Sequence, residues 1–304
     1  TPLYSSAASD VYKRQAHLGI AAFKPGEEMA NVIGRADQAL AQAQSHPEKP
    51  WERLDDFNAS AGHGLHDWRR WIDDALNQSM LQLYFQPVAA CADTSQVLHQ
   101  KVPARLLDPQ GEAVAAGRFL PWIERLGWAA RFDLAMLEHS LAHLAKYPQP
   151  LALSLSAATL RDATSLEKLL NLLKEHPQQG ELMTLELDER YLPPPAELEK
   201  LSQQVREAGY HLGLQHFGGH FSLIGNLTHL GLAYLKIDGT YIRAIDKEDD
   251  KRVFIEAIFR ATNSIDLPLI AEMVETEGEL EALKELGIHG AMGRLIGAPA
   301  PWQG

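Results

Sequence analysis

The chain has 304 residues, which corresponds to roughly two domains or one large barrel. Its 28 Lys and Arg against 40 Asp and Glu give a net charge of −12, which argues against unspecific binding of DNA or RNA, because phosphate binding needs a basic face. A hydrophobic fraction of 45% and a single cysteine, Cys91, exclude wholesale disorder, an internal disulfide and a cysteine-rich zinc site. The longest apolar runs are shorter than the ~20 residues of a membrane span, and no secretory signal is visible.

The residue composition and the apolar spacing change several times along the N-terminal part of the chain. Residues 1–15 are small, polar and aperiodic, and we interpret them as a ragged or non-native start. Residues 17–23 read as a short strand, and 29–44 have the apolar spacing of a helix. Prolines and charges follow that helix, so we place a linker at 52–67 and a further helix at 68–80.

From residue 81 onward, apolar runs alternate with helical patterns. Eight such runs separated mostly by helices favour a (β/α)8 barrel of the α/β class, with an open doubly wound sheet as the alternative. The expected strands are residues 81–88, 97–107, 151–156, 182–187, 211–217, 232–237, 267–274 and 289–296. The clearest helices are 132–145, 166–174, 196–207, 251–262 and 277–285.

Polar residues lie at or just after the ends of these strands. Strand ends meet solvent, so a single polar residue there needs no special explanation, but seven consecutive ends favour a polar cup that binds a ligand. The residues are Gln86, Lys101, Arg105, Ser154, Ser156, Glu186, Asp188, Glu189, Gln215, His216, Lys236, Asp238, Glu272 and Glu275.

Several blocks of sequence carry a family resemblance. They include LYFQPV at 83–88, LSLSA at 153–157, LELDE at 185–189, HFGGHFS at 216–222, LKIDGTYI at 235–242, AEMVETEGEL at 271–280 and GRLIGAPAP at 293–301. Through them, residues 68–304 resemble the EAL domain of cyclic di-GMP phosphodiesterases, which implies a TIM-like barrel. Residues 16–51, with RADQAL at 35–40, resemble the C-terminal end of an α/β GGDEF domain. The pair is most similar to LapD-type receptors, in which a degenerate GGDEF–EAL pair binds cyclic di-GMP without cleaving it.

The positions that match the family's metal ligands have changed in chemistry. EAL enzymes hydrolyse a phosphodiester with two divalent metal ions, held mainly by carboxylates. The matching residues here are Lys101, Ser154, Glu186, Gln215, His216 and Glu272, of which only Glu186 and Glu272 are carboxylates. We expect no metal to bind and Lys101 to pair with Glu186 or Glu272. In the alternative, His216, Glu186 and Glu272 bind zinc or manganese.

The resemblance also implies a ligand set without catalysis. Lys236 matches the catalytic lysine, but no catalytic residue is expected, and Met292 stands where the family has a glutamine near the attacking water. Arg105 matches an arginine that meets a ligand phosphate, and Glu189 matches an acid that stabilises the loop at 216–222. The expected ligand-binding residues are Gln86, Lys101, Pro103, Arg105, Glu186, Lys236, Asp238, Glu272 and Glu275.

The function that the resemblance implies is a non-catalytic cyclic di-GMP receptor in bacterial signal transduction and biofilm control, signalling to an upstream domain or partner. Binding then requires no cofactor. The alternatives are a weak phosphodiesterase that uses Mg or Mn to form linear pGpG, and an interaction module without ligand. The implied partners are cyclic di-GMP, a second copy of the chain near Phe221, and a periplasmic protease reached through upstream parts. The implied location is a cytoplasmic domain of a protein anchored in the inner membrane.

Overall fold

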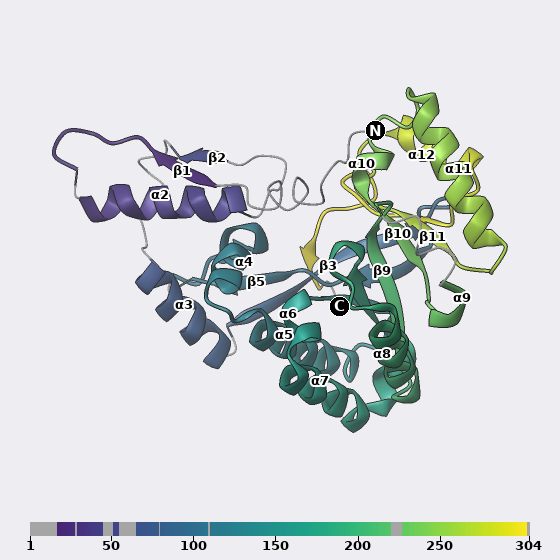
Figure 1. Ribbon diagram of the computed structural model, residues 1–304, viewed down its shortest axis with the longest axis horizontal. Coiled ribbons are helices and arrows are strands. Elements are labelled where there is room, and N and C mark those ends of the chain that lie inside the picture. The colour runs from purple at the N-terminus through teal and green to yellow at the C-terminus, as the bar shows by residue number, and fades with distance from the viewer. Residues whose placement is uncertain are drawn as a thin grey trace, which may run out of the picture. The chain divides into compact units, whose positions relative to one another are not determined.

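The computed structural model describes residues 17–27, 29–44, 51–54, 65–78, 80–108, 110–219 and 227–302 (Figure 1). The start at 1–15, most of the 52–67 linker, and Phe221 with its loop lie outside the described residues. The chain divides into two compact units, residues 1–80 with 106–128 and residues 81–105 with 129–304. Among the described residues, no helix has the length and apolar character needed to cross a membrane.

The smaller unit contains a two-stranded parallel sheet packed on a helix. Strands β1 (Leu18–Ala21) and β2 (Trp51–Leu54) pair with Leu18 opposite Trp51, and α2 (Met29–Gln44) lies against them. Gly19 permits the close packing, because a Cβ there would stand 2.0 Å from the carbonyl oxygen of Ala36. The expected strand at 17–23 and helix at 29–44 are confirmed.

The rest of the smaller unit is built around stacked indoles. Helix α3 (Leu65–Asn77), strand β6 (Ala113–Ala115) and helix α4 (Ala116–Arg125) complete it. Trp68 stacks on the fully buried Trp122 with ring centroids 5.5 Å apart, and Trp71 Nε1 donates to the carbonyl of Leu107 at 2.9 Å. These tryptophans are therefore packing residues.

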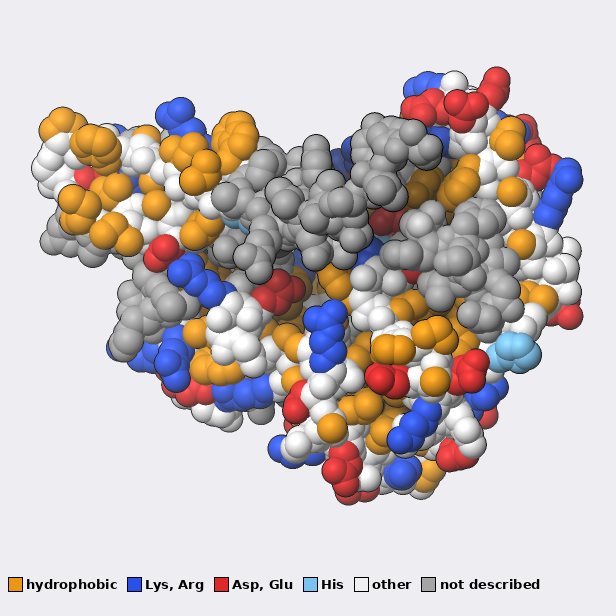
Figure 2. All heavy atoms as spheres, viewed as in Figure 1, with side chains coloured by type: hydrophobic (Ala, Val, Ile, Leu, Met, Phe, Trp, Pro, Cys, Tyr) orange, Lys and Arg blue, Asp and Glu red, His pale blue; other side chains and the backbone are white. Residues whose placement is uncertain are grey.

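Apolar side chains are also exposed on the smaller unit. Figure 2 shows hydrophobic side chains gathered over β1, β2 and α2, at the left of the view. The exposed residues are Leu18, Ile20, Phe23, Met29, Ile33 and Trp51.

The larger unit is a closed barrel of eight strands, as the sequence predicts; the open-sheet alternative is wrong. The strands are β3 (Leu81–Ala90), β4 (Val97–Lys101), β7 (Leu151–Leu155), β8 (Met183–Asp188), β9 (His211–Phe217), β10 (Leu235–Ile237), β11 (Leu269–Ala271) and β12 (Gly290–Ala291). They pair in the order β12-β11-β10-β9-β8-β7-β4-β3, and β12 closes the ring on β3. The short strand β13 (Ala300–Pro301) adds to β3.

Each predicted apolar run overlaps one barrel strand, with two differences in detail. β3 runs antiparallel to both β4 and β12, whereas the other neighbours are parallel. The run at 97–107 breaks into β4 and β5 (Ala104–Leu107) at Val102 and Pro103, because proline has no N–H for the ladder.

Helices connect the strands of the barrel, and two of them begin at residues that cap their first turn. Thr276 and Glu279 form a reciprocal capping box at α12 (Glu277–Glu285), and Asp162 caps α7 (Ala163–Glu175) through the N–H of Ser165. The other helices are α5 (Ala129–Leu144), α6 (Ala157–Arg161), α8 (Pro195–Glu207), α9 (Leu227–Leu230), α10 (Gly239–Ile242) and α11 (Asp249–Asn263), with short 3-10 turns at Pro177–Leu182 and Glu189–Tyr191. The carboxyl ends of the parallel strands therefore meet at one end, which we call the barrel mouth.

Candidate functional site

Lys101 lies at the centre of a polar cluster at the barrel mouth. Strands β4, β7, β8 and β9 bring Lys101, Ser154, Glu186 and Gln215 together. The Lys101 ammonium donates to Ser154 Oγ, to Glu186 Oε2 and, at 2.9 Å, to Gln215 Oε1. Ser154 Oγ also donates to Gln215 Oε1 at 3.0 Å. The expected pairing of Lys101 with Glu186 is thus present.

Glu186 is a fully buried carboxylate held between two lysines. Its Oε1 accepts from the Tyr234 hydroxyl at 2.7 Å and lies 2.5 Å from Lys236 Nζ, which is also fully buried. Burial alone raises the pKa of Glu186, but the charges of Lys101 and Lys236 outweigh it and hold this pKa well below its ordinary value. Burial lowers the pKa of Lys236, and Glu186 opposes that shift. Glu186 therefore stays ionised as the counter-charge of both lysines.

Tyr234 is a site residue that the sequence analysis missed. Its ring occupies space next to Gly213, where a Cβ would stand 2.9 Å from the ring. Glycine at this point of β9 lets the hydroxyl reach Glu186 on β8, the neighbouring strand. In the sequence, Tyr234 precedes the LKID block inside an apolar run, so its pattern is that of a core residue.

His216 lies on the same side of the barrel and contacts acids from three strand ends. Its backbone is left-handed, with φ of 55°, next to a register shift between β9 and β10. Nδ1 lies 2.9 Å from Glu272 Oε2 and 3.7 Å from Asp238 Oδ2, and Nε2 lies 3.9 Å from Asp188 Oδ2. Burial lowers the pKa of His216, but Glu272 and Asp188 reverse this and raise it above the ordinary value. The protonated form is therefore favoured here.

The loop after β9 is anchored by Glu189, as the resemblance implies. Glu189 is buried, and its Oε2 accepts from the backbone N–H of Gly218 at 2.7 Å and of Gly219 at 3.1 Å. Gly218 has φ of 147°, and a Cβ there would stand 2.3 Å from the Tyr241 ring. The start of this loop is therefore fixed by a carboxylate and a close aromatic contact.

The phosphate-binding candidate Arg105 has its guanidinium over an aromatic ring. Its Cζ lies 4.9 Å from the centre of the Tyr84 ring, and Nη1 donates to the carbonyl of Ala104 at 2.9 Å. Among the described residues, no carboxylate lies within ion-pair distance of Arg105, so the guanidinium keeps most of its donors for a ligand. Pro103 accepts from the N–H of Tyr84 and ties Arg105 to β3.

The remaining ligand candidates have structural contacts of their own. Gln86 faces Lys101 across the β3–β4 ladder and donates to the carbonyl of Gly297 at 3.1 Å. Asp238 caps α10 by accepting from the N–H and hydroxyl of Thr240, at 2.8 and 2.7 Å. Glu272 is 6% exposed, whereas Glu275 is exposed to solvent. Met292 packs on the barrel interior beside Tyr234 and Val88.

Asp133 is a second residue that the sequence analysis missed. It is buried on α5, and its Oδ2 accepts from the N–H and hydroxyl of Ser156, both at 2.7 Å, and from Thr159 Oγ1 at 2.5 Å. Asp133 thereby fixes the chain directly after β7. A lone aspartate within a helical pattern gave no sign of this role.

The donors at the mouth do not fit a pair of hard cations. A lysine ammonium stands among the strand ends. Glu186 Oε2 accepts from Lys101, and Glu186 Oε1 accepts from Tyr234 and forms an ion pair with Lys236. Within the described ranges, no group of three or more His, Cys, Asp and Glu side chains has an arrangement that could hold a metal ion. The alternative zinc or manganese site also loses Glu186, because Glu272 alone of its two acids contacts His216.

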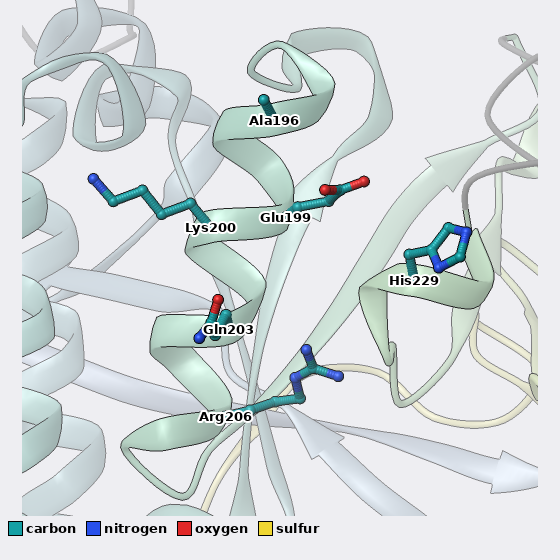
Figure 3. Close-up of a pocket in the computed structure, with 6 residues that line it drawn as sticks. All are labelled: Ala196, Glu199, Lys200, Gln203, Arg206 and His229. Atoms are coloured by element: carbon teal, nitrogen blue, oxygen red, sulfur yellow. The ribbon is translucent and has the colours of Figure 1, made fainter.

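A surface pocket between α8 and α9 lies apart from these residues. Figure 3 shows the side chains of Glu199 and Arg206 extending from α8 toward α9, which carries the lining residue His229. All of its lining residues are exposed and none belongs to the predicted set, so it is a surface depression.

These observations define the class of protein. It is an α/β barrel with charged and amide side chains at the ends of its strands. The family model described as the EAL domain matches residues 69–299. The chain belongs to the EAL domain family.

Proteins similar to this chain include bacterial signalling proteins. The chain is 26% identical over 298 residues to the bifunctional diguanylate cyclase/cyclic di-GMP phosphodiesterase MucR of Pseudomonas aeruginosa, covering 94% of this chain and 43% of that protein. It therefore spans less than half the length of this curated relative. The structure of Vibrio cholerae LapD S helix-GGDEF-EAL bound to c-di-GMP has a TM-score of 0.79 at 21% identity, over 92% of this chain and 69% of that one. The Pseudomonas aeruginosa FimX EAL domain bound to c-di-GMP has a TM-score of 0.67 at 24% identity, over 77% and 96%.

Proposed function

We propose that this chain is a receptor that binds cyclic di-GMP at the barrel mouth and does not hydrolyse it. The observation that carries the proposal is the bonding of Lys101 to Glu186, Ser154 and Gln215 at positions where the family places metal ligands. The six matching positions hold one lysine and two glutamates, a formal charge of −1 that protonation of His216 makes less negative still. Two hard cations need more carboxylate oxygens than this set supplies.

Binding of the dinucleotide is supported by the groups that remain available. Cyclic di-GMP carries two phosphates, and the Arg105 fork suits two parallel hydrogen bonds to phosphate oxygens. The contact with the Tyr84 ring orients the Arg105 guanidinium before a ligand binds. Lys101 adds a cation close by, and the side chains of Gln86, Asp238 and Glu275 offer donors and acceptors to guanine edges.

A weak metal-dependent phosphodiesterase is the second candidate function. It is favoured by the acids and the lysine that remain at matching positions, Glu186, Glu272 and Lys236. In such an enzyme, metal ions would have to displace Lys101 from Glu186 before binding. A partner-binding scaffold without ligand is a weaker candidate, because it has no use for an unpaired Arg105 in register with the other candidates.

One experiment separates these functions. Calorimetric titration of cyclic di-GMP in EDTA, followed by chromatography of the same samples after incubation with Mg or Mn, measures binding and product together. We expect saturable binding in EDTA and no linear pGpG with either metal. Hydrolysis at rates of intact EAL enzymes would overturn the receptor proposal, and absence of binding would favour the scaffold.

Arg105 gives the sharpest test of the binding pose. Losing a charge-assisted contact to phosphate should weaken binding about tenfold to a hundredfold in Arg105→Ala. Arg260→Ala is the matched control, because Arg260 is exposed on α11 and pairs with Glu256. Equal affinity of Arg105→Ala and the wild type would remove Arg105 from the site.

The wider setting is also part of the proposal. We propose that residues 16–51 are the C-terminal remnant of a GGDEF domain, and that the barrel works on the cytoplasmic side of an inner-membrane protein. Its output would follow LapD-type receptors, with a homodimer and a periplasmic protease as partners. Light scattering with and without cyclic di-GMP tests the dimer, and a mass that stays monomeric under both conditions would contradict it.

A further inference from the structure

Arg190 is a cation at the barrel mouth that the ligand set above does not include. It lies in the 3-10 turn Glu189–Tyr191, directly after β8. Its Nε and Nη2 donate to Asp188 Oδ1 and Oδ2, at 2.9 and 2.6 Å, so a bidentate pair fixes the plane of the guanidinium. Asp188 ends β8, and its Oδ2 lies 3.9 Å from Nε2 of His216 on β9. The carboxylate that holds Arg190 therefore belongs to the mouth.

The guanidinium of Arg190 has a second edge available. Among the residues that the structure describes, only Asp188 accepts hydrogen bonds from this side chain, so Nη1 and the outer hydrogen of Nη2 remain for a ligand. The side chain is 49% exposed, and its Cζ lies 5.5 Å from the centre of the Tyr191 ring. The hydrogen bonds to Asp188 raise the pKa of Arg190, burial opposes that rise, and the charge of Asp238 after β10 adds to it. The free edge is thus accessible to solvent and within electrostatic range of another strand end.

Arg190 and the phosphate-binding candidate Arg105 lie on opposite sides of Lys101 in the strand order. The sheet runs β8-β7-β4-β3-β5, with Lys101 on β4, Arg105 on β5 and Arg190 just after β8. In a cyclic dinucleotide, the two bases project outward from the ring of sugars and phosphates. Phosphates held by Arg105 and Lys101 leave one base free to reach the β8 side of the mouth.

We propose that Arg190 recognises guanine in the bound dinucleotide, through two parallel hydrogen bonds from its free edge to O6 and N7. The inference rests on the proposed binding of cyclic di-GMP and adds a residue that determines which base is accepted. Guanine presents two acceptors on this edge, whereas adenine presents the N6 donor in place of O6. Because Asp188 already holds the guanidinium, little side-chain freedom is lost when the base binds.

A ligand that lacks one acceptor atom tests the contact directly. The 7-deaza analogue of cyclic di-GMP replaces N7 by C–H and keeps both phosphates, O6 and the Watson–Crick edge. In calorimetric titrations of the whole chain, the wild type should bind cyclic di-GMP about tenfold more tightly than the analogue, since a charge-assisted hydrogen bond is lost. Arg190→Ala should bind cyclic di-GMP about tenfold to a hundredfold more weakly than the wild type and should no longer distinguish the two ligands.

The control is Arg252→Ala, because Arg252 pairs with Glu285 on the outer surface of the barrel. This variant should keep the full preference for cyclic di-GMP. Melting temperatures report folding, and the exposed position of Arg190 predicts little change in Arg190→Ala. A wild type that binds both ligands equally, or an Arg190→Ala variant that keeps the preference, would overturn this inference alone. A wild type that binds neither ligand would overturn the receptor proposal and this inference with it.

Discussion

Replacing Glu186 with glutamine tests the charge arrangement at the centre of the barrel. The substitution keeps the size of the side chain and removes the carboxylate shared by Lys101 and Lys236. Glu186 and Lys236 have fully buried side chains, and the side chain of Lys101 is 15% exposed. Two ammonium groups would then face each other with little solvent to screen them.

The expected loss of stability is large. Breaking a buried ion pair by removing one partner costs about 3–5 kcal/mol, because the other charge stays buried. For a domain of this size, that corresponds to a fall in melting temperature of roughly 6–20 °C. Lys101→Met in the same chain removes one of the stranded charges, so the double variant should be more stable than the sum of the singles predicts, by about 1–3 kcal/mol.

Urea unfolding followed by circular dichroism at pH 7 measures all four proteins of this cycle. Glu285→Gln is the control, because Glu285 pairs with Arg252 at the surface and should change stability by no more than about 0.5 kcal/mol. A loss below about 1 kcal/mol for Glu186→Gln would refute the reasoning on buried charge. Strict additivity in the cycle would refute the pairing of Glu186 with Lys101.

The same carboxylate sets a pH dependence of stability. The folded protein holds the pKa of Glu186 below its ordinary value of 4.5. The stabilisation is therefore fully present above pH 4.5 and is lost as the pH falls from there toward the folded pKa. Glu186→Gln should lack this acid-dependent component.

Three further predictions concern other described residues. Glu189→Ala should speed amide exchange at Gly218 and Gly219 and cost about 1–3 kcal/mol, since the buried N–H of Gly218 and the part-buried N–H of Gly219 lose their acceptor; unchanged exchange would contradict this anchor. Wild-type stability should fall as the pH drops from 6.5 toward about 3, because His99 is neutral when folded and protonated when unfolded, and His99→Phe should show a flatter profile in urea titrations. Gly293→Ala should cost about 2–3 kcal/mol, because φ is 152° and a Cβ would stand 2.3 Å from Val274 N, whereas Gly117→Ala in α4 has open space and should stabilise by about 0.5–1 kcal/mol. Equal melting temperatures for the two glycine variants would be incompatible with that reasoning.

Much of the barrel could be predicted because its strands are buried on both faces. Such strands appear as continuous apolar runs, and 151–156 and 211–217 match β7 and β9 almost to the residue. The composition of a strand does not indicate whether it runs parallel or antiparallel to its neighbours. The antiparallel course of β3 therefore could not be read from 81–88, and only pairing with β4 and β12 reveals it.

The site was predicted less completely, for a related reason. The strand-end rule identifies which polar residues gather, but not which atoms pair. Lys101 had two candidate acids, and the structure gives it Glu186 while His216 takes Glu272. Tyr234 escaped notice because a tyrosine in an apolar run has the pattern of a packing residue, and its hydroxyl acts across the barrel interior.

The antiparallel strand β3 also bears on how the barrel folds. The ring closes only when Ala89 and Ala90 meet Ala291 and Gly290, near the two ends of the barrel sequence. On a ribosome, the barrel therefore stays open until β12, its last strand, has been made. Contacts this distant in sequence slow folding, and an open parallel sheet exposes unpaired edges. Truncation just before Gly290 should thus leave an aggregation-prone open sheet, although all of the predicted ligand-binding residues, from Gln86 to Glu275, would still be present.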